Sequence, residues 1–302
     1  MPKYPIQLTH RIISIIGLGN PEPKYQNTRH NVAALVIRKM WSQLASLKTT
    51  KAFKAHTLIA RTRAEPGSKQ FTRHLTKFFD EKVLAHTKAD YKPKYVLELN
   101  IKETYFEGIK MMLFTPTLLR NMDYDGPPFS VYDYDFPRRF DLYRHTYCLG
   151  YVDNTFMNQN GKVVANFFEK QQKFFEEQVK DVIYYLDGEP TDDFTFSNYI
   201  MTDDVETPIG KVKIRDKYSS DRGHNGLRDC KRYLGIYEDI PYVKISVGIS
   251  LKNWENDIFS ELLLRDFVLG EFTPKELDYL NNESIPMLWD ELHKLEMIVA
   301  AK

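Results

Sequence analysis

The sequence contains only two cysteines, Cys148 and Cys230, among its 302 residues. Two cysteines cannot form a disulfide framework or a four-cysteine zinc site, and they are typical of a chain in a reducing compartment. The sequence also lacks an apolar run of about 18 residues, so we expect no transmembrane helix and no membrane partner. Its first ten residues lack the apolar stretch of a secretory signal and are short for a mitochondrial presequence. We therefore expect a mitochondrial or cytoplasmic protein.

The sequence has almost no excess charge of either sign, with 42 Lys and Arg against 41 Asp and Glu. Global charge therefore indicates neither a nucleic-acid nor a membrane partner. The charge is nevertheless uneven, because residues 48–94 hold 12 basic and 4 acidic residues, whereas residues 251–302 hold 5 and 11. The basic stretch is either a solvated surface or an arm that binds phosphates, and charge patterning alone leaves both open.

Short apolar runs alternate with segments of helical periodicity along much of the chain. Residues 11–18 (RIISIIGL) predict a buried strand, and residues 30–47 predict a helix. Further strands are predicted at residues 95–99, 111–114, 198–202, 211–215 and 243–249, and further helices at residues 161–185, 226–233, 259–269 and from 274 onward. This alternation predicts an α/β fold: a three-layer α-β-α single domain with a mixed, mostly parallel sheet. Sites in such folds lie in the loops beyond the strand ends.

Several polar loops follow the predicted strands. His30 is placed at a helix start in residues 19–31, where it is either a capping or surface residue or a neutral base. The segment 202–208 holds Asp203, Asp204 and Glu206, which are either solvated acids or a divalent-metal site. The sequence has neither a Gly-x-Ser-x-Gly elbow nor the third glycine of a dinucleotide fingerprint after Gly17. A water nucleophile activated by His30 and Asp203 or Asp204 is the natural alternative.

Five sequence blocks resemble, in order, the bacterial-type peptidyl-tRNA hydrolase family. The blocks are GLGNPEPKYQNTRHNV (17–32), TFMNQNGKVV (155–164), YIMTDDVETPIGKVKIR (199–215), DRGHNGLRD (221–229) and DFVLGEFTPKE (266–276). Glu22 stands where glycine is usual, which is more similar to fungal members. The resemblance implies hydrolysis of the ester between a peptide, or an N-blocked amino acid, and the 3′ end of tRNA. It implies a monomer that needs no metal or cofactor.

The resemblance also implies roles for individual residues. His30 matches the essential histidine of the family, Asp203 matches its partner aspartate, and Asn20 completes the catalytic set. In the same blocks, Asn158, Asn225 and Tyr25 match substrate-binding positions, and Lys213 and Arg215 match positions that contact tRNA phosphates. Lys244, outside the five blocks, matches a further phosphate position on a weaker alignment. An aspartate that accepts a hydrogen bond from one imidazole nitrogen raises the basicity of the other, which is the chemistry this set requires.

The chain departs from the usual family pattern in three places. Residues 1–302 are expected to form one domain with insertions at about 64–145 and 175–197. The first insertion includes much of the basic stretch, so an added contact with tRNA or the ribosome is one expectation and surface elaboration is the other. Residues 219–222 replace a segment that is usually rich in glycine. The alternative to an active esterase is a non-catalytic RNA-binding relative that acts in RNA processing or a ribonucleoprotein.

Overall fold

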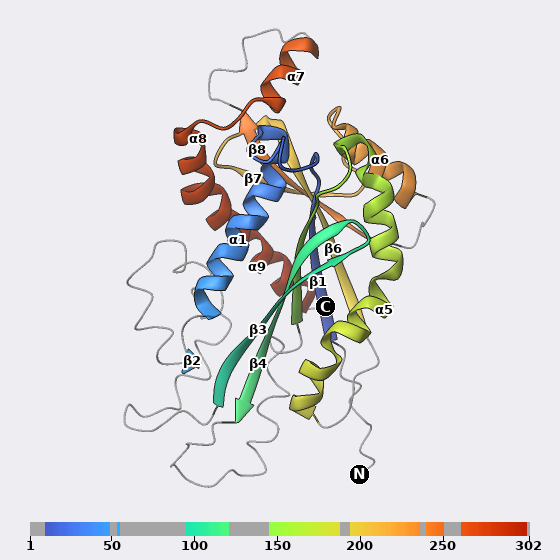
Figure 1. Cartoon of the computed structure of the whole chain (residues 1–302), viewed down its shortest axis with the longest axis vertical. Helices are drawn as coiled ribbons and strands as arrows, with labels where there is room; N and C mark the ends of the chain where they lie inside the picture. The colour runs from blue at the N-terminus through green and yellow to red at the C-terminus, as the bar shows by residue number, and fades with distance from the viewer. Residues whose placement is uncertain are drawn as a thin grey trace.

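Strands and helices alternate along the chain in the computed structural model (Figure 1). The structure describes residues 10–48, 53–54, 95–120, 145–187, 194–235, 240–250 and 261–300. The strands are β1 (His10–Gly17), β2 (Phe53–Lys54), β3 (Tyr95–Phe106), β4 (Ile109–Arg120), β5 (His145–Val152), β6 (Phe194–Pro208), β7 (Val212–Asp216) and β8 (Val243–Ser250). The α-helices are α1 (Val32–Lys48), α5 (Asn160–Asp187), α6 (Asn225–Leu234), α7 (Glu261–Leu269), α8 (Pro274–Tyr279) and α9 (Ile285–Ala300). Short helical turns are η1 (Arg29–Asn31), η5 (Met157–Gln159) and the π-helical η7 (Leu280–Ser284).

The strands form one eight-stranded sheet in the order β2-β3-β4-β5-β1-β6-β8-β7. The central strands β5, β1, β6 and β8 are parallel, whereas β7 and the strands β2 to β4 pair antiparallel. The predicted mixed sheet is therefore confirmed, but the parallel part is limited to its centre. A parallel centre brings the carboxyl ends of β1, β6 and β8 to the same edge of the sheet.

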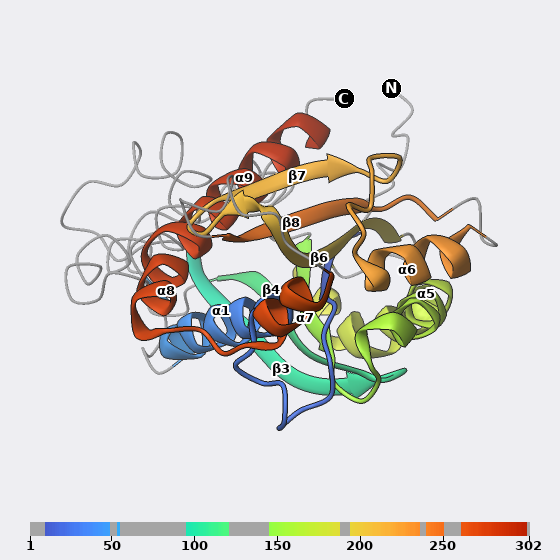
Figure 2. The same cartoon turned by 90° about the horizontal axis from the view of Figure 1, so that it is seen from above.

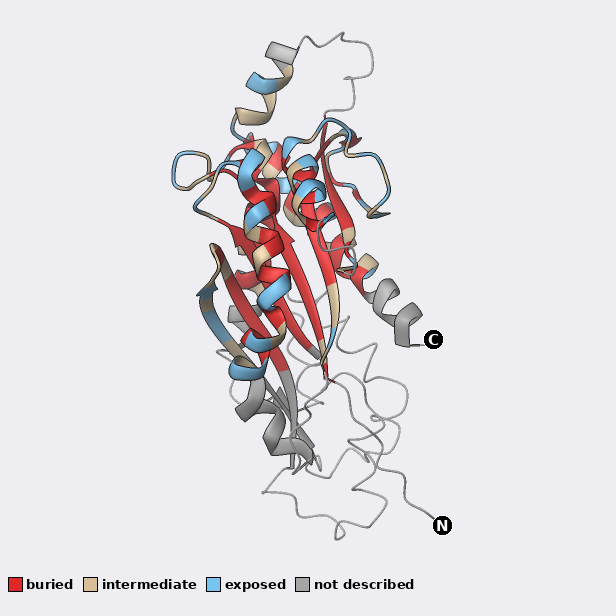
Figure 3. Cartoon of the chain, turned by 90° about the vertical axis from the view of Figure 1, so that its right-hand side faces the viewer, coloured by how far each residue is buried: buried red, intermediate tan, exposed pale blue. Residues whose placement is uncertain are grey.

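Helices cover both faces of the sheet, which confirms the three layers (Figures 1 and 2). On one face α1, η7 and α9 pack on the sheet, with Trp41 and Trp289 in the same buried cluster. On the other face α5 and α6 pack on it through a cluster that includes Phe167, Phe175 and Leu227. Figure 3 shows buried strands between helices whose outer faces are exposed. None of the described helices has the length and apolar character needed to span a membrane.

Strand β1 forms where the sequence predicts it because its side chains are apolar on both faces. Ile12, Ile13, Ile15 and Ile16 are fully buried, as a central parallel strand between two helical layers requires. The start of α5 depends on a small residue, because a Cβ atom at Gly161 would lie 2.3 Å from the backbone carbonyl of Asp229 in α6. The two helices can therefore approach closely, and they do so next to the carboxyl edge of the sheet.

The structure describes part of each segment that is expected to be an insertion. Strands β3 and β4 lie within residues 64–145, yet β4 pairs with β5 over Ile109–Phe114, so they extend the central sheet. Helix α5 runs without interruption to Asp187, through much of the second segment. Residues 64–94, 121–144 and 188–193 lie outside the described residues, and with them most of the basic stretch.

Strand β6 is also longer than predicted. It continues to Pro208, so Asp203 and Asp204 lie within the strand rather than in a loop after it. Pairing with β8 extends to Asp204, and the register then shifts before Pro208. Carboxylates rarely occupy buried strand positions unless they are paired, and both of these are paired here.

Candidate active site

A pocket of about 620 Å³ lies at the carboxyl edge of the parallel strands. Its lining comes from the loop after β1, the end of β6, the turn before α6, the η5 turn and α7. Asn20, His30, Asn158, Asp203 and Asn225 all line it. Sequence segments that are far apart in the chain are thus brought together at the edge where an α/β sheet usually binds its ligands.

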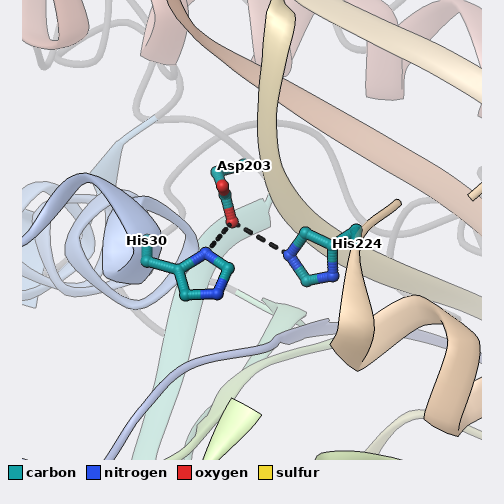
Figure 4. A group of neighbouring side chains, drawn as sticks. All are labelled: His30, Asp203 and His224. Carbon is teal, nitrogen blue, oxygen red and sulfur yellow. Dashed lines mark hydrogen bonds and ion pairs between the residues drawn. The ribbon is translucent and has the colours of Figure 1, made fainter. Parts of the chain in front are cut away.

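His30 and Asp203 form the central contact of this pocket (Figure 4). The Nδ1 atom of His30 lies 2.8 Å from Oδ1 of Asp203, and both side chains are largely buried. Burial alone lowers the pKa of His30, but the charge of Asp203 and its hydrogen bond overcome that effect, so the pKa is raised above its ordinary value of 6.5. Because Nδ1 donates to the carboxylate, Nε2 of the neutral ring is an unprotonated base.

His224 is a functional candidate that the sequence analysis missed. Its Nε2 atom lies 2.9 Å from the same Oδ1 of Asp203, and its ring centroid lies 5.2 Å from that of His30. The backbone N–H of Leu227 donates to Nδ1 of His224. Nδ1 is therefore an acceptor, and in the neutral ring Nε2 carries the proton that it donates to Asp203. The sequence offers one signal for such a role, because His224 is a second histidine placed directly before a predicted helix.

Asp203 accepts from two histidines through one oxygen atom (Figure 4). Its burial would raise its pKa, but the charges and hydrogen bonds of His30 and His224 hold that pKa well below its usual range. The carboxylate is therefore charged at neutral pH, and it orients both imidazole rings. Such a group favours a proton on His30 and thus makes His30 a stronger base.

The three side chains lie close enough to one another to suggest a metal site, because one ligand atom of each lies within 4.8 Å of the others. The hydrogen bonds argue against that use. Nε2 of His224 carries a proton as long as Nδ1 accepts from Leu227, so it has no free lone pair for a cation.

The alternative metal site at Asp203, Asp204 and Glu206 is not assembled either. Asp204 accepts from Thr207 and Arg215 through Oδ2, while Glu206 forms an ion pair with Arg222. Arginines thus neutralise both carboxylates, since Arg222 also lies 4.0 Å from Oδ1 of Asp204, and Glu206 is 55% exposed. This arrangement is that of charge pairs in a strand and its neighbouring loop, not of convergent ligands.

Asparagine side chains hold the two loops that line the pocket. Asn31 accepts from the backbone N–H of Asn20 and donates to its carbonyl, at 2.8 and 2.9 Å. Oδ1 of Asn20 accepts from the backbone N–H of Met157, and Oδ1 of Asn160 accepts from that of Gly19. Because Oδ1 of Asn20 is occupied in this way, its amide group presents N–H donors at the pocket. Asn160 also joins the loops, because its amide donates to the carbonyl of Phe156.

The residues expected at the tRNA side occupy different environments. Tyr25 lies outside the pocket lining, but its ring contacts that of Phe156, which lines the pocket, with centroids 6.4 Å apart. Lys213 is exposed on β7, which forms one edge of the sheet. Arg215 lines the pocket but is paired with Asp204 at 2.8 Å.

Lys244, the third residue expected to contact phosphate, lines the pocket but is bound within the protein. Its side chain is 2% exposed, and its ammonium group is bound by Asp221 and by the carbonyl of Ser219. Two of its three N–H donors are therefore used inside the protein. The alternation of polar and apolar residues along the strand does not predict that Lys244 is buried, because the loop that covers it comes from another part of the chain.

Arg29, directly before His30, connects the site to the C-terminal segment. Its guanidinium forms two hydrogen bonds with Glu276, both 2.9 Å, and lies over the ring of Phe267. Glu276 also accepts from the backbone N–H and hydroxyl of Thr273, which caps α8. This paired, buried carboxylate fixes the segment that carries His30 against the segment between α7 and α8.

We expect Glu276→Gln to lower the free energy of unfolding at pH 7 by about 3 to 5 kcal/mol, because Arg29 is left largely buried without its counterion. Burial raises the pKa of Glu276, but Arg29 and Thr273 lower it further, so the net shift is downward. The carboxylate therefore contributes stability that is complete above about pH 4.3 and is lost as the pH falls below it. Denaturant unfolding at pH 7 and pH 3.5 measures both effects.

The control for this prediction is Glu283→Gln. Glu283 is 44% exposed and lies 3.9 Å from Lys211, so its loss should change the free energy of unfolding by about 1 kcal/mol or less. Equal destabilisation by the two variants would contradict a specific role for the Arg29–Glu276 pair.

Comparison with known proteins connects this geometry to one family. The model of the family described as peptidyl-tRNA hydrolase matches residues 14–117 and 141–297. The chain is 30% identical over 145 residues to a peptidyl-tRNA hydrolase of Porphyromonas gingivalis, which is 48% of this chain and 58% of that protein. It is 28% identical over 140 residues to a peptidyl-tRNA hydrolase of Saccharomyces cerevisiae, which is 46% of this chain and 62% of that protein. The matches thus span little more than half the length of these relatives.

The crystal structure of peptidyl-tRNA hydrolase from Acinetobacter baumannii aligns with a TM-score of 0.46 at 16% sequence identity, and the alignment covers 97% of this chain and 94% of that one.

Proposed function

Because the chain belongs to the peptidyl-tRNA hydrolase family, we propose that it hydrolyses the ester between a peptide, or an N-blocked amino acid, and the 3′ end of tRNA. The observation that carries this proposal is the contact between Nδ1 of His30 and Oδ1 of Asp203 in a pocket lined by asparagine amides. This contact leaves Nε2 of His30 as a base that faces the space where a water molecule and an ester can meet.

The reaction follows from these groups. Nε2 of His30 accepts a proton from water as the water oxygen attacks the ester carbonyl carbon, and Asp203 stabilises the imidazolium that forms. The bond to the ribose oxygen then breaks, and His30 returns the proton to that oxygen. The products are a free peptide carboxylate and a tRNA with an intact 3′ hydroxyl group.

The asparagines are suited to stabilise this reaction without added charge. The amide of Asn20 donates to the oxyanion that develops on the carbonyl oxygen, and this preorganised donor is available because Oδ1 is already bound by Met157. Asn158 and Asn225 line the same pocket and bind the peptide backbone. Since every peptide shares that backbone, this mode of binding accepts many side-chain sequences.

The tRNA binds beside the pocket through phosphate contacts and ring stacking. Lys213 and Arg215 lie two residues apart on β7, and Tyr25 lies next to Phe156 at the pocket entrance. Phosphate contacts of this kind position a nucleic acid without reading its bases. Lys213 is exposed, which supports a direct contact with a phosphate. Arg215 binds a phosphate only if it gives up its ion pair with Asp204.

The experiment that tests the function is hydrolysis of N-acetyl-aminoacyl-tRNA by the purified protein, with and without a chelator. We expect release of the acylated amino acid at the same rate under both conditions. Loss of activity with the chelator would contradict the metal-free mechanism. Tight tRNA binding without any release would instead support the alternative, an RNA-binding relative that does not catalyse hydrolysis.

A second prediction concerns Lys213. Replacing it with glutamine should weaken tRNA binding and lower the slope of log Kd against log salt concentration by about one, because one phosphate contact is removed. Filter binding of deacylated tRNA at several salt concentrations measures this slope. An unchanged slope would place the tRNA backbone away from β7.

We further propose that residues 1–302 form one domain and that the basic stretch at residues 48–94 adds a contact with tRNA or the ribosome. The inclusion of β3 and β4 in the central sheet supports a single domain. Sedimentation of the full chain with ribosomes, with and without charge-neutralising substitutions in that stretch, tests the contact.

A further inference from the structure

A buried charge close to the pocket has no part in the proposed reaction. Lys244 lies on β8, and its side chain is 2% exposed. Its Nζ atom donates to the carbonyl of Ser219 at 2.6 Å and to Oδ1 of Asp221 at 2.7 Å. Burying a charge costs free energy unless the charge is paired and hydrogen-bonded. A buried lysine without a part in the reaction is therefore expected to hold its partners in place.

The partners of Lys244 belong to the turn that leads into α6. This turn contains consecutive residues with positive φ, Arg222 at 48° and Gly223 at 78°. It lacks the hydrogen-bond ladder of a helix or strand, so its shape depends on side-chain contacts. Asp221 contributes one side-chain and one backbone contact: its side chain binds Lys244, and its backbone carbonyl accepts from the backbone N–H of His224 at 2.8 Å.

The contacts continue from His224 to the catalytic carboxylate. Nε2 of His224 lies 2.9 Å from Oδ1 of Asp203. Asp203 is on β6, and Lys244 pairs with Ile200 of the same strand, three residues earlier. The path from Lys244 through Asp221 and His224 to Asp203 thus begins and ends on adjacent, hydrogen-bonded strands. Those strands form a rigid frame on which the turn is held.

The geometry points to Lys244 as a positioning residue that holds His224 against Asp203 by way of Asp221. His224 in turn keeps the carboxylate oriented toward His30. The segment 219–222 replaces a stretch that is expected to be rich in glycine, and the ammonium group of Lys244 supplies the order that this turn needs. This role rests on the proposed hydrolase function for its effect on turnover, but the position of His224 can be measured without turnover.

The first test compares Lys244→Met with Lys213→Met in the full chain. Lys244→Met should lower kcat about 10- to 100-fold, because a small displacement of catalytic groups has effects of that size. It should leave KM and its salt dependence unchanged. Lys213→Met should instead raise KM and reduce the salt dependence. Lys170→Met, which removes a half-exposed lysine paired with Glu107 on the outer face, is the control and should change neither parameter.

The double variant Lys244→Met/Asp221→Ala removes both members of this ion pair, so neither charge is left buried without its partner. It therefore provides the test if the single variant folds poorly. We expect its kcat to match that of Lys244→Met rather than the product of the two single effects, because the residues act as one unit. A reduced salt slope for Lys244→Met would assign Lys244 to phosphate binding and overturn the proposal. Wild-type kcat in either variant would overturn it as well.

The ring nitrogens of His224 give a readout that is independent of hydrolysis. In the wild-type protein, nitrogen-15 NMR should show Nε2 protonated and Nδ1 unprotonated at neutral pH. Lys244→Met should shift both nitrogen resonances toward the values expected for a mixture of the two neutral tautomers. If the wild-type protein fails to hydrolyse the ester, the proposed function fails, and these shifts still decide the role of Lys244. Unchanged shifts in the variant would contradict it.

Discussion

Replacing His30 with alanine is expected to lower kcat for N-acetyl-aminoacyl-tRNA hydrolysis about 10²- to 10⁴-fold, the usual range for loss of a general base. Nδ1 of His30 is bound to Asp203, so Nε2 is the basic atom that faces the pocket, and alanine supplies none. The dissociation constant for deacylated tRNA should stay nearly unchanged, because the proposed phosphate contacts lie on β7. Single-turnover kinetics and filter binding separate the two quantities.

Two additions make this experiment decisive. Exogenous imidazole should restore part of the lost rate to His30→Ala, because the side-chain deletion leaves space beside Asp203 for a small base. His30→Gln, which fills that space without supplying a base, should lose activity and gain little from imidazole. Full activity of His30→Ala would refute the mechanism, and a large loss of tRNA affinity would mean that His30 contributes mainly to binding.

The sequence predicts the parts of the fold whose local pattern agrees with their packing. Strand β1 is rich in isoleucine, with Ser14 as the one polar residue between them, and it is a central parallel strand buried on both faces. Helix α5 begins close to the predicted position, because the polar turn before it and the apolar stripe after it are both local signals. His30 and Asp203 were paired through the family resemblance, and the structure brings their side chains into contact.

Features that depend on tertiary contacts were not predictable from local patterns. Asp203 and Asp204 read as loop residues, but strand β6 continues through them because histidines and an arginine compensate their charges. Lys244 alternates with apolar residues as an exposed strand residue would. Its burial follows from the turn at residues 219–222, which is distant in sequence. The long spacing between the first two family blocks predicts an insertion that includes β3 and β4. The spacing does not reveal that these strands join the central sheet through the pairing of β4 with β5.

His224 shows the same limit within the site itself. Its side chain caps α6, since its Nδ1 accepts from the backbone N–H of Leu227. The sequence carries no sign that the opposite nitrogen of the same ring reaches Asp203. A capping role and a catalytic contact are compatible here because an imidazole has two nitrogens on opposite sides of the ring.

Asp203→Asn is expected to lower kcat/KM about 10²- to 10⁴-fold at neutral pH and to move the acid limb of the pH profile to lower pH. Asparagine has the shape of aspartate, and its carbonyl oxygen can still accept from His30 and His224. It carries no charge, however, so it neither raises the pKa of His30 nor stabilises the imidazolium that forms during water attack. The site then keeps its geometry and loses its electrostatic support.

The direction of the pH shift follows from the protonation state that His30 needs. His30 acts as a base only when Nε2 is unprotonated, so activity falls as the pH drops through its pKa. Asp203 raises that pKa above 6.5, and the acid limb of the wild-type profile should therefore lie above pH 6.5. Without the carboxylate the pKa falls and the limb moves down, while the plateau rate drops because a weaker base accepts the proton.

Measurement of kcat/KM between pH 5 and pH 9 tests this prediction, with Asp278→Asn as the control for loss of an exposed carboxylate on α8. Thermal unfolding of each variant separates a folding defect from a catalytic one. A plateau equal to that of the wild-type protein would remove Asp203 from the mechanism. An acid limb that moves to higher pH would mean that a group other than His30 titrates, and the base would then have to be sought elsewhere in the pocket.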